Sequence, residues 1–547
     1  MNWINTLLLD IIPHGQMKNR IRGNCNMKMK KILPIVIASC MVLLTACGEK
    51  SNDASDTGKI KEGGTIVFAA GGDPRVLNPM YGNDRVTMTI NNAVYSPLFD
   101  IENGEKQYYL AESFTPSEDF LTYTLKLKKD LKWHDGEALT ADDIVFTLDK
   151  ILDKSQKSLL RGDLLVDGKP VEYKKVDDLT VEFKMPRVMM NFESALASFS
   201  PIPKHIFQGE TDIATSTKNE NPIGSGPYKF KEHKKGESVT LVKNEDYFGG
   251  KPHIDTVVYR IIADANSSTS AFLNGEISAK YVDPRDIDKF QDKATIETYD
   301  EGMLVNAIMN FDSPALAKKE VRQAIAYALD KDEIIKAGYI DEKYALKAYS
   351  DLVPTTLYYT DDVNKYEKNV EKAKELIAQS GMKDITLNII FTNGKKSDEA
   401  TALVMQERLK DIGIDLQIVP MERNAFIQKL FTEGKKDFDM AINAYVMGNE
   451  PNAYRSMFET GAENNISNYV NKDLDKKWEA ANGETDKDKR KELYKEIQQT
   501  LSEDLPIYPI TYSQSIIAID KKIGGVKEAK PAPIFMFKDL SKLYLTE

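Results

Sequence analysis

The residue with the clearest chemical potential in this chain is Cys47, whose thiol follows a short apolar run. Small residues stand directly before it, in the sequence Leu44-Thr45-Ala46. The apolar run, Ile32 to Ala46, begins behind a basic cluster formed by Lys28, Lys30 and Lys31. A basic start, a short apolar core and small residues at the end are the parts of a secretory signal peptide. The core is shorter than the roughly 20 apolar residues of a spanning helix, so we expect it to be removed.

The residues around Cys47 resemble the bacterial lipobox, in which the cysteine becomes the new N-terminus and carries a diacylglycerol thioether. Two or more acyl chains, at about 0.8 kcal/mol per buried methylene, hold a protein on a membrane where one chain would not. The resemblance implies lipidation at Cys47 and a location on the extracytoplasmic face of the cell membrane. The alternative is an ordinary secretory signal in which the cysteine falls by chance.

The removed segment also changes the charge of the protein. Residues 1–26 precede a signal that is complete from 27 to 46, which indicates an over-long start-codon assignment. Loss of residues 1–46 takes away six basic residues and one acidic residue, so the formal net charge goes from −11 to −16. A surface this acidic disfavours nucleic acid and anionic lipid as partners. Since the only cysteines are Cys25, Cys40 and Cys47, the exported body has no disulfide and no thiolate metal site.

The body of the chain shows no catalytic pattern. Its histidines are far apart and form no H-x-x-x-H or H-x-x-E-H pair: His134, His205, His233 and His253. Neither a G-x-S-x-G elbow nor a Walker A loop occurs. Trp133-His134-Asp135-Gly136 is predicted to be an Asp-Gly turn that ends a strand. We therefore expect no enzyme, no cofactor and no metal, although a metal site built from distant residues stays open.

A body of about 500 residues is too large for one hydrophobic core and should divide into two or three domains. Residues 47–64 offer little to bury and are expected to be a flexible tether. The following part contains short strand-like runs, and Thr140 is placed as the N-cap of a helix. The predicted strands of this part include Thr65–Ala70, Tyr123–Lys128 and Thr180–Lys184.

After about residue 300 the pattern changes from short strands to amphipathic helices. The alternation of strand and helix there indicates an α/β lobe. Gly381 is expected to end one of the helices in a left-handed conformation. The predicted helices are Lys318–Tyr339, Val370–Gln379, Ala400–Ile412 and Asp486–Glu503, and the predicted strands are Thr386–Phe391, Ile414–Val419 and Pro506–Ile519, the last of which could return to the first lobe.

Several motifs, in order from about Gly63 to the C-terminus, resemble those of the bacterial extracellular solute-binding proteins of family 5. This family contains the oligopeptide-, dipeptide- and nickel-binding proteins of ABC importers. One motif alone would be weak evidence, but the ordered series is specific. The motifs are Asp73-Pro-Arg-Val-Leu-Asn-Pro79, Leu110-Ala-Glu-Ser-Phe114, the block from Leu131 to Asp143, Pro203-Lys-His205, Gly224-Ser-Gly-Pro-Tyr228, Asn244-Glu-Asp-Tyr-Phe248 and the run from Val321 to Asp330.

The resemblance implies an α/β fold of the type II periplasmic-binding-protein class, with three lobes and a hinged, two-sided cleft. Ligand would lie between lobes I and III, which close over it by a hinge motion. In peptide-binding members the ligand backbone pairs with cleft strands as an added β-strand. The expected bounds are 65–104, 208–300 and 513–547 for lobe I, 105–207 for lobe II and 301–512 for lobe III.

The resemblance also implies a ligand site, with one departure. Many peptide-binding members carry an Asp just before an N-E-P triplet, which binds the ligand's α-ammonium; here Met447 or Gly448 stands there. A buried ammonium needs a paired carboxylate, so either Glu450 or Asp84 takes that role or the ligand is not held by a free amino terminus. Glu450 could equally be an exposed turn residue, and Tyr445 a core residue. The candidate ligand-binding residues are Asp84, Arg85, Tyr445, Met447, Asn449 and Glu450.

These observations favour a lipid-anchored binding protein that captures peptides and delivers them to an ABC importer. The expected partners are a peptide ligand and a pair of permeases with cytoplasmic ATPases. We expect a monomer that touches the membrane only through its lipid anchor and does not bind nucleic acid. Two alternatives stay open. One is a binding protein for a metal chelate or another small solute, and the other is a receptor for a signalling peptide.

Overall fold

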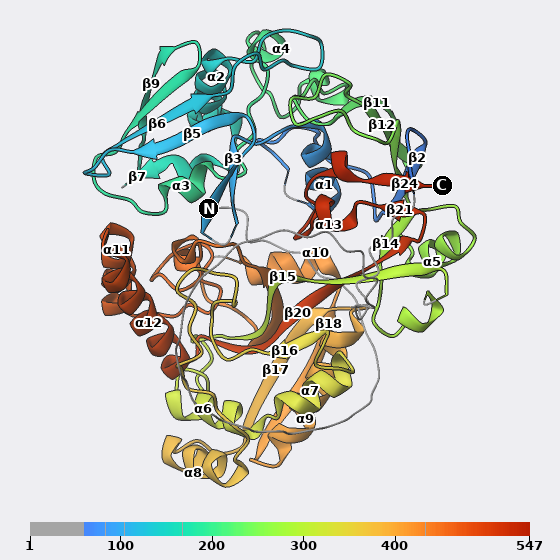
Figure 1. The fold of residues 1–547 in the computed structure, drawn as a ribbon. Coiled ribbons are helices and arrows are strands. Elements are labelled where there is room, and N and C mark those ends of the chain that lie inside the picture. The colour runs from blue at the N-terminus through green and yellow to red at the C-terminus, as the bar shows by residue number, and fades with distance from the viewer. Residues whose placement is uncertain (1–58, 83, 103, 167, 291, 433) are drawn as a thin grey trace, which may run out of the picture.

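The computed structural model describes residues 59–547 apart from 83, 103, 167, 291 and 433, so the signal region and Cys47 lie outside the described residues. A large mixed sheet runs through the molecule (Figure 1). Its strands follow the order β11 (Tyr228–Lys234), β12 (Ser238–Lys243), β13 (Thr256–Ile261), β2 (Thr65–Ala70), β14 (Ala279–Tyr281), β20 (Ile507–Asp520), β15 (Ala294–Met309), β19 (Met440–Val446), β17 (Ile385–Thr392) and β18 (Ile414–Met421), with β16 (Ala345–Lys347) paired to β20.

The two long strands β15 and β20 connect the halves of this sheet. The register of their pairing shifts between Asp300 and Met303, where the chain passes from one half to the other. Gly302, inside this bulge, has a φ of +66°, and a Cβ there would lie 2.4 Å from the carbonyl oxygen of Met447. Glycine alone fits both conditions. The predicted strand Pro506–Ile519 is confirmed as β20, and it does return to the first lobe.

Lobe I surrounds the β11 to β14 side of the sheet (Figure 1), and it contains both ends of the described chain, which pair with each other as β1 and β24. Its core is apolar and includes Ile66, Phe68, Val257 and Ile517. The further elements of this lobe are α1 (Arg85–Val94), α5 (Ala265–Leu273), α13 (Val526–Ala529), β1 (Ile60–Lys61), β21 (Ile523–Gly524), β22 (Pro531–Ala532), β23 (Met536–Phe537) and β24 (Tyr544–Thr546).

The expectation of a flexible tether up to residue 64 is wrong for its last residues. β1 pairs with β24 near the C-terminus, and the Gly63 amide donates to the carbonyl of His253 at 2.8 Å. Glu62 also lies 2.8 Å from the His253 ring. A short polar segment can be ordered in this way because an existing strand edge satisfies its backbone groups.

Lobe II is a four-stranded antiparallel sheet, in the order β5, β6, β10, β9, with helices and an aromatic-rich core. The predicted helix at Thr140 is confirmed as α2, and Thr140 and Asp143 form a capping box. The β3–β4 hairpin spans the predicted boundary at 105, and Phe99 belongs to the core of this lobe. The elements are β3 (Phe99–Glu102), β4 (Glu105–Tyr108), β5 (Ala111–Pro116), β6 (Thr122–Leu127), α2 (Ala141–Leu152), β7 (Leu165–Val166), β8 (Lys169–Pro170), β9 (Glu172–Asp177), β10 (Thr180–Lys184), α3 (Phe192–Leu196) and α4 (Lys204–Phe207).

Lobe III carries the β15 to β18 side of the sheet, with helices on both faces. The single helix predicted from Lys318 to Tyr339 is wrong: it breaks at Leu329, and Asp330 caps a second helix. The ending at Gly381 is confirmed, with a φ of +72°. The helices are α6 (Lys319–Ala328), α7 (Lys331–Gly338), α8 (Val370–Ser380), α9 (Lys396–Lys410), α10 (Arg423–Leu430), α11 (Lys472–Gly483) and α12 (Lys487–Asp504).

Candidate ligand-binding site

The lobe I side of the predicted site is the start of α1. Asp84 is the N-cap of this helix, and its carboxylate accepts hydrogen bonds from the Thr87 amide at 3.0 Å and the Thr87 hydroxyl at 2.7 Å. Arg423, at the start of α10 in lobe III, lies near enough to Asp84 of lobe I for the two charges to interact. Burial lowers the pKa of Arg423, and the Asp84 charge opposes that shift. Asp84 therefore lies where lobe I faces lobe III.

Arg85 is directed into the molecule. Its guanidinium forms an ion pair with Glu301 at 2.6 Å and lies over the ring of Tyr281 at 4.5 Å. Glu301 is fully buried and also accepts hydrogen bonds from the Ser515 hydroxyl at 2.5 Å and the Ile534 amide at 3.1 Å. Arg85 thus joins α1 to β15, and Glu301 in turn joins β15 to β20 through Ser515. Sequence reasoning missed Glu301, although an acidic pair inside a long apolar strand was a visible signal.

On the lobe III side, Tyr445 and Met447 are both 3% exposed. The Met447 amide donates to the carbonyl of Gly302 at 2.7 Å, which holds the end of β19 against the hinge. The Asn449 side-chain amide donates to the carbonyl of Ile101 and so joins lobe III to the β3–β4 hairpin. The residues from Tyr445 to Asn449 therefore lie where the lobes meet.

β19 presents an unpaired edge in this region. It pairs along its length with β15, but β17 pairs only with Met440 and Ala441 at its beginning. Within the described residues, 442–446 thus have no strand neighbour on that side. Unpaired N–H and C=O groups of a strand edge can accept an added strand.

Glu450 is not an exposed turn residue, since its side chain is 6% exposed. Its carboxylate forms an ion pair with Arg490 of α12 at 2.8 Å and accepts a hydrogen bond from the Asn452 amide at 3.1 Å. Burial raises the pKa of Glu450, and the Arg490 charge opposes that shift. A role of Glu450 or Asp84 in holding an ammonium group remains a prediction, as do the other predicted ligand contacts.

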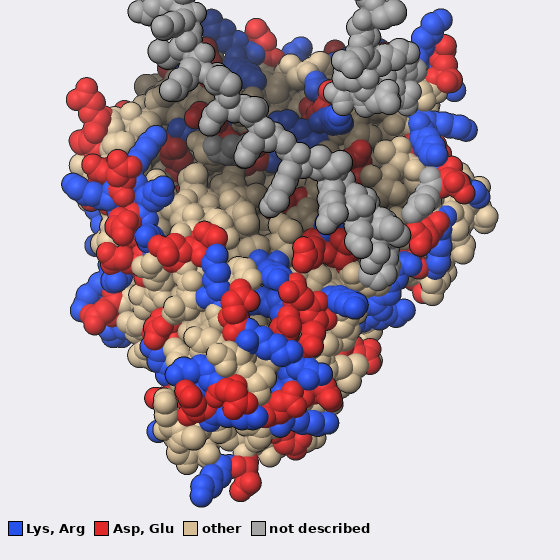
Figure 2. Space-filling view, turned by 60° about the horizontal axis from the view of Figure 1, so that its bottom comes forward, with Lys and Arg blue, Asp and Glu red and all other residues tan. Residues whose placement is uncertain are grey.

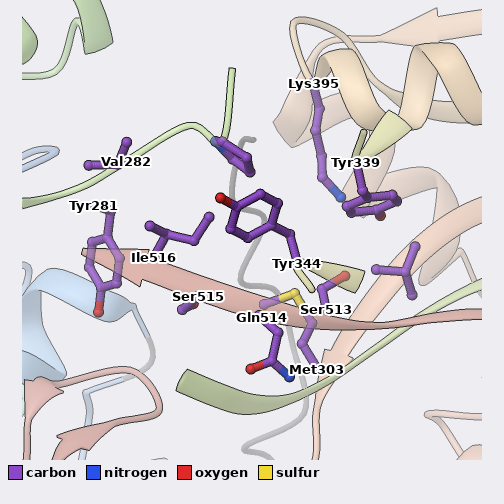
Figure 3. Close-up of a pocket in the computed structure, with 12 residues that line it drawn as sticks. Tyr281, Val282, Met303, Tyr339, Tyr344, Lys395, Ser513, Gln514, Ser515 and Ile516 are labelled. Carbon is purple, nitrogen blue, oxygen red and sulfur yellow. The ribbon is translucent and has the colours of Figure 1, made fainter. Parts of the chain in front are cut away.

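A small cavity lies beside the hinge (Figure 3). Tyr281 and Val282 of lobe I line it together with Ser513–Ile516 of β20 and with Tyr339 and Lys395 of lobe III. Its volume of about 30 Å³ suits about two water molecules, far less than a peptide residue needs. The cavity therefore marks a place where lobes I and III touch, and it is too small to hold a peptide residue.

Figure 2 shows a hollow above lobe III and a mixed distribution of charge below it. Acidic and basic side chains alternate over this face, so it carries no continuous basic stripe of the kind that binds nucleic acid.

No group of three or more potential metal ligands occurs in the described part of the chain. Among the helices of residues 59–547, none meets the length and hydropathy of a membrane span.

Comparison with known proteins places the fold in a family. The sequence profile described as "Bacterial extracellular solute-binding proteins, family 5 Middle" matches residues 106–466. The chain belongs to this family. The chain is similar to the oligopeptide-binding protein AppA of Bacillus subtilis, with 32% identity over 92% of this chain and 97% of AppA.

Solved structures agree with this assignment. The ABC transporter substrate-binding protein CtaP of Listeria monocytogenes is 47% identical, with a TM-score of 0.87 over 89% of this chain and all of CtaP. AppA of B. subtilis, solved in complex with a nonapeptide, is 31% identical, with a TM-score of 0.76 over 89% of this chain and all of AppA. The family 5 resemblance and the type II periplasmic-binding-protein fold are thus confirmed. Members of this family are transport binding proteins, so this chain is a solute-binding protein and not an enzyme.

Proposed function

We propose that this protein captures peptides between lobes I and III, outside the cytoplasmic membrane, and delivers them to an ABC importer. The observation that carries the proposal is the edge of β19 at residues 442–446, which has no strand neighbour on the β17 side and ends beside the contact of Met447 with Gly302. An extended peptide can add to such an edge through its backbone, which makes binding tolerant of side-chain identity.

The comparisons support the same ligand class. AppA binds a nonapeptide in its solved complex, and it covers nearly the whole of this chain. The mass of the ligand released from purified protein on denaturation tests the assignment. The importer partners, two permeases with cytoplasmic ATPases, follow from the family, and the monomeric state is part of the same proposal.

We further propose that Cys47 carries the lipid anchor. Replacing Cys47 with Ser removes the acceptor thiol, so the variant should appear in the medium or the soluble fraction, while ligand binding by the folded body stays unchanged. Fractionation of cells followed by immunoblotting measures this. Retention of Cys47→Ser in the membrane fraction at the level of the unaltered protein would contradict the anchor.

A further inference from the structure

Lobe II contacts lobe III directly, through residues that belong to neither β15 nor β20. The contact joins residues 187–191, between β10 and α3, to the C-terminal part of α11. Arg187 of lobe II forms an ion pair with Glu479 of α11 at 2.8 Å. Figure 1 shows α11 below lobe II, on the same side as α3.

Asn482 makes the second part of this contact through backbone amides of lobe II. Its side-chain oxygen accepts a hydrogen bond from the Asn191 amide at 3.2 Å, and its carbonyl accepts one from the Met190 amide at 2.9 Å. Asn482 is only 2% exposed. Its carbonyl belongs to the last turn of α11, where helices leave carbonyls without an internal partner. Lobe II therefore supplies hydrogen-bond donors to the C-terminal end of α11 in lobe III.

Glu479 is held in position from within lobe III. Arg455 lies 2.5 Å from the Glu479 carboxylate and also pairs with Glu459 at 2.7 Å. This arrangement presents the carboxylate toward Arg187 without requiring lobe II to order it. Arg455 of lobe III thus holds one oxygen of the Glu479 carboxylate, while the other oxygen pairs with Arg187 of lobe II.

We propose that Arg187 and residues 190–191 of lobe II form a latch with Glu479 and Asn482 of lobe III, and that this latch stabilises the closed arrangement even without ligand. The latch would regulate ligand binding at the proposed peptide site. Only this biological purpose rests on the proposed function. Lobe II is inserted between two segments of lobe I, so opening of the hinge between lobes I and III would also separate lobe II from α11, and every latch contact favours the arrangement in which they touch. If ligand binds the closed state, the apparent affinity equals the intrinsic affinity of that state multiplied by the fraction of molecules that are closed. A latch that raises the closed fraction therefore raises the apparent affinity.

The test measures closure in protein freed of ligand, with emptiness checked by native mass spectrometry. Cys25, Cys40 and Cys47 are the only cysteines, so replacing them with Ser leaves a chain in which two new cysteines can be labelled cleanly. Val176 of lobe II and Val470 of lobe III are 53% and 65% exposed and suit fluorophores after replacement with Cys. Single-molecule energy transfer then gives the ratio of closed to open molecules.

Arg187→Glu places a carboxylate against Glu479 and should lower this ratio roughly fivefold or more. Asn482→Ala removes one accepted hydrogen bond and should lower it roughly twofold to tenfold. The matched control is Arg260→Glu, because Arg260 forms an exposed ion pair with Glu276 at 2.7 Å inside lobe I and should not alter closure.

Arg187 is about one-third exposed, so Arg187→Glu should fold. This variant therefore remains informative even if Asn482→Ala fails to fold. Equal closed fractions in Arg187→Glu and the unaltered protein would overturn the latch, and so would an unaltered protein that is open throughout. The measurement uses no ligand, so a failure of the peptide assignment would leave its outcome intact.

Discussion

Glu450→Gln is expected to lower the free energy of unfolding by about 3 to 5 kcal/mol, because it leaves the buried Arg490 guanidinium without its counter-charge. Both side chains are nearly inaccessible, at 6% and 5% exposed. Arg490 also donates to the Ala481 carbonyl at 3.0 Å and lies over the rings of Tyr358 and Tyr494, but none of these groups carries a full charge. Denaturant-induced unfolding measures the loss.

Glu276→Gln is the matched control for this experiment. Glu276 pairs with Arg260 in an exposed position, so its loss should cost about 1 kcal/mol or less. If Glu450→Gln unfolds like the unaltered protein but binds peptide at least about tenfold more weakly, Glu450 serves the ligand's amino group and not the core of lobe III.

Asp351→Asn is expected to stabilise the protein at neutral pH. Asp351 in lobe III is fully buried, neither carboxylate oxygen has a hydrogen-bond partner within the described residues, and burial raises its pKa to about 8. The unfolded chain ionises near the ordinary value, whereas the folded protein keeps the proton. Stability is therefore full below about pH 4 and falls by up to about 1.4 kcal/mol per pH unit as the pH rises toward 8.

At pH 7 the Asn variant should thus be more stable by about 3 to 5 kcal/mol, and the difference should vanish near pH 4. Lys331, whose pKa burial lowers to about 7, stays charged in both states below that pH, so the window from pH 4.5 to 6.5 isolates Asp351. Asp361→Asn, at an exposed position beside Lys365, should show no such trend. A pH-independent difference between Asp351→Asn and the unaltered protein would contradict this origin.

Local features of this fold could be predicted from the sequence because neighbouring residues determine them. The capping box of Thr140 and Asp143 and the ending at Gly381 depend only on a few adjacent positions. The break at Leu329 was missed because the apolar spacing continues across it, while the competing cap at Asp330 decides the structure.

The site was less predictable because its charges pair over long separations. Arg85 and Glu301 are 216 residues apart, and Glu450 and Arg490 are 40 apart. No local pattern shows which charges will meet, so residues placed in a ligand site by family resemblance can instead be engaged with the hinge or the core. The partners of Glu301, Glu479 and Asn482 became visible only once the lobes were assembled.

Peptide binding between lobes I and III can be tested by identifying what the protein carries. Protein purified from its native membrane is denatured, and the released ligand is identified by mass spectrometry and returned to the refolded protein in a calorimeter. We expect a set of peptides of varied sequence that bind again with one molecule per protein. A single non-peptide solute or metal chelate that accounts for all rebinding would contradict it.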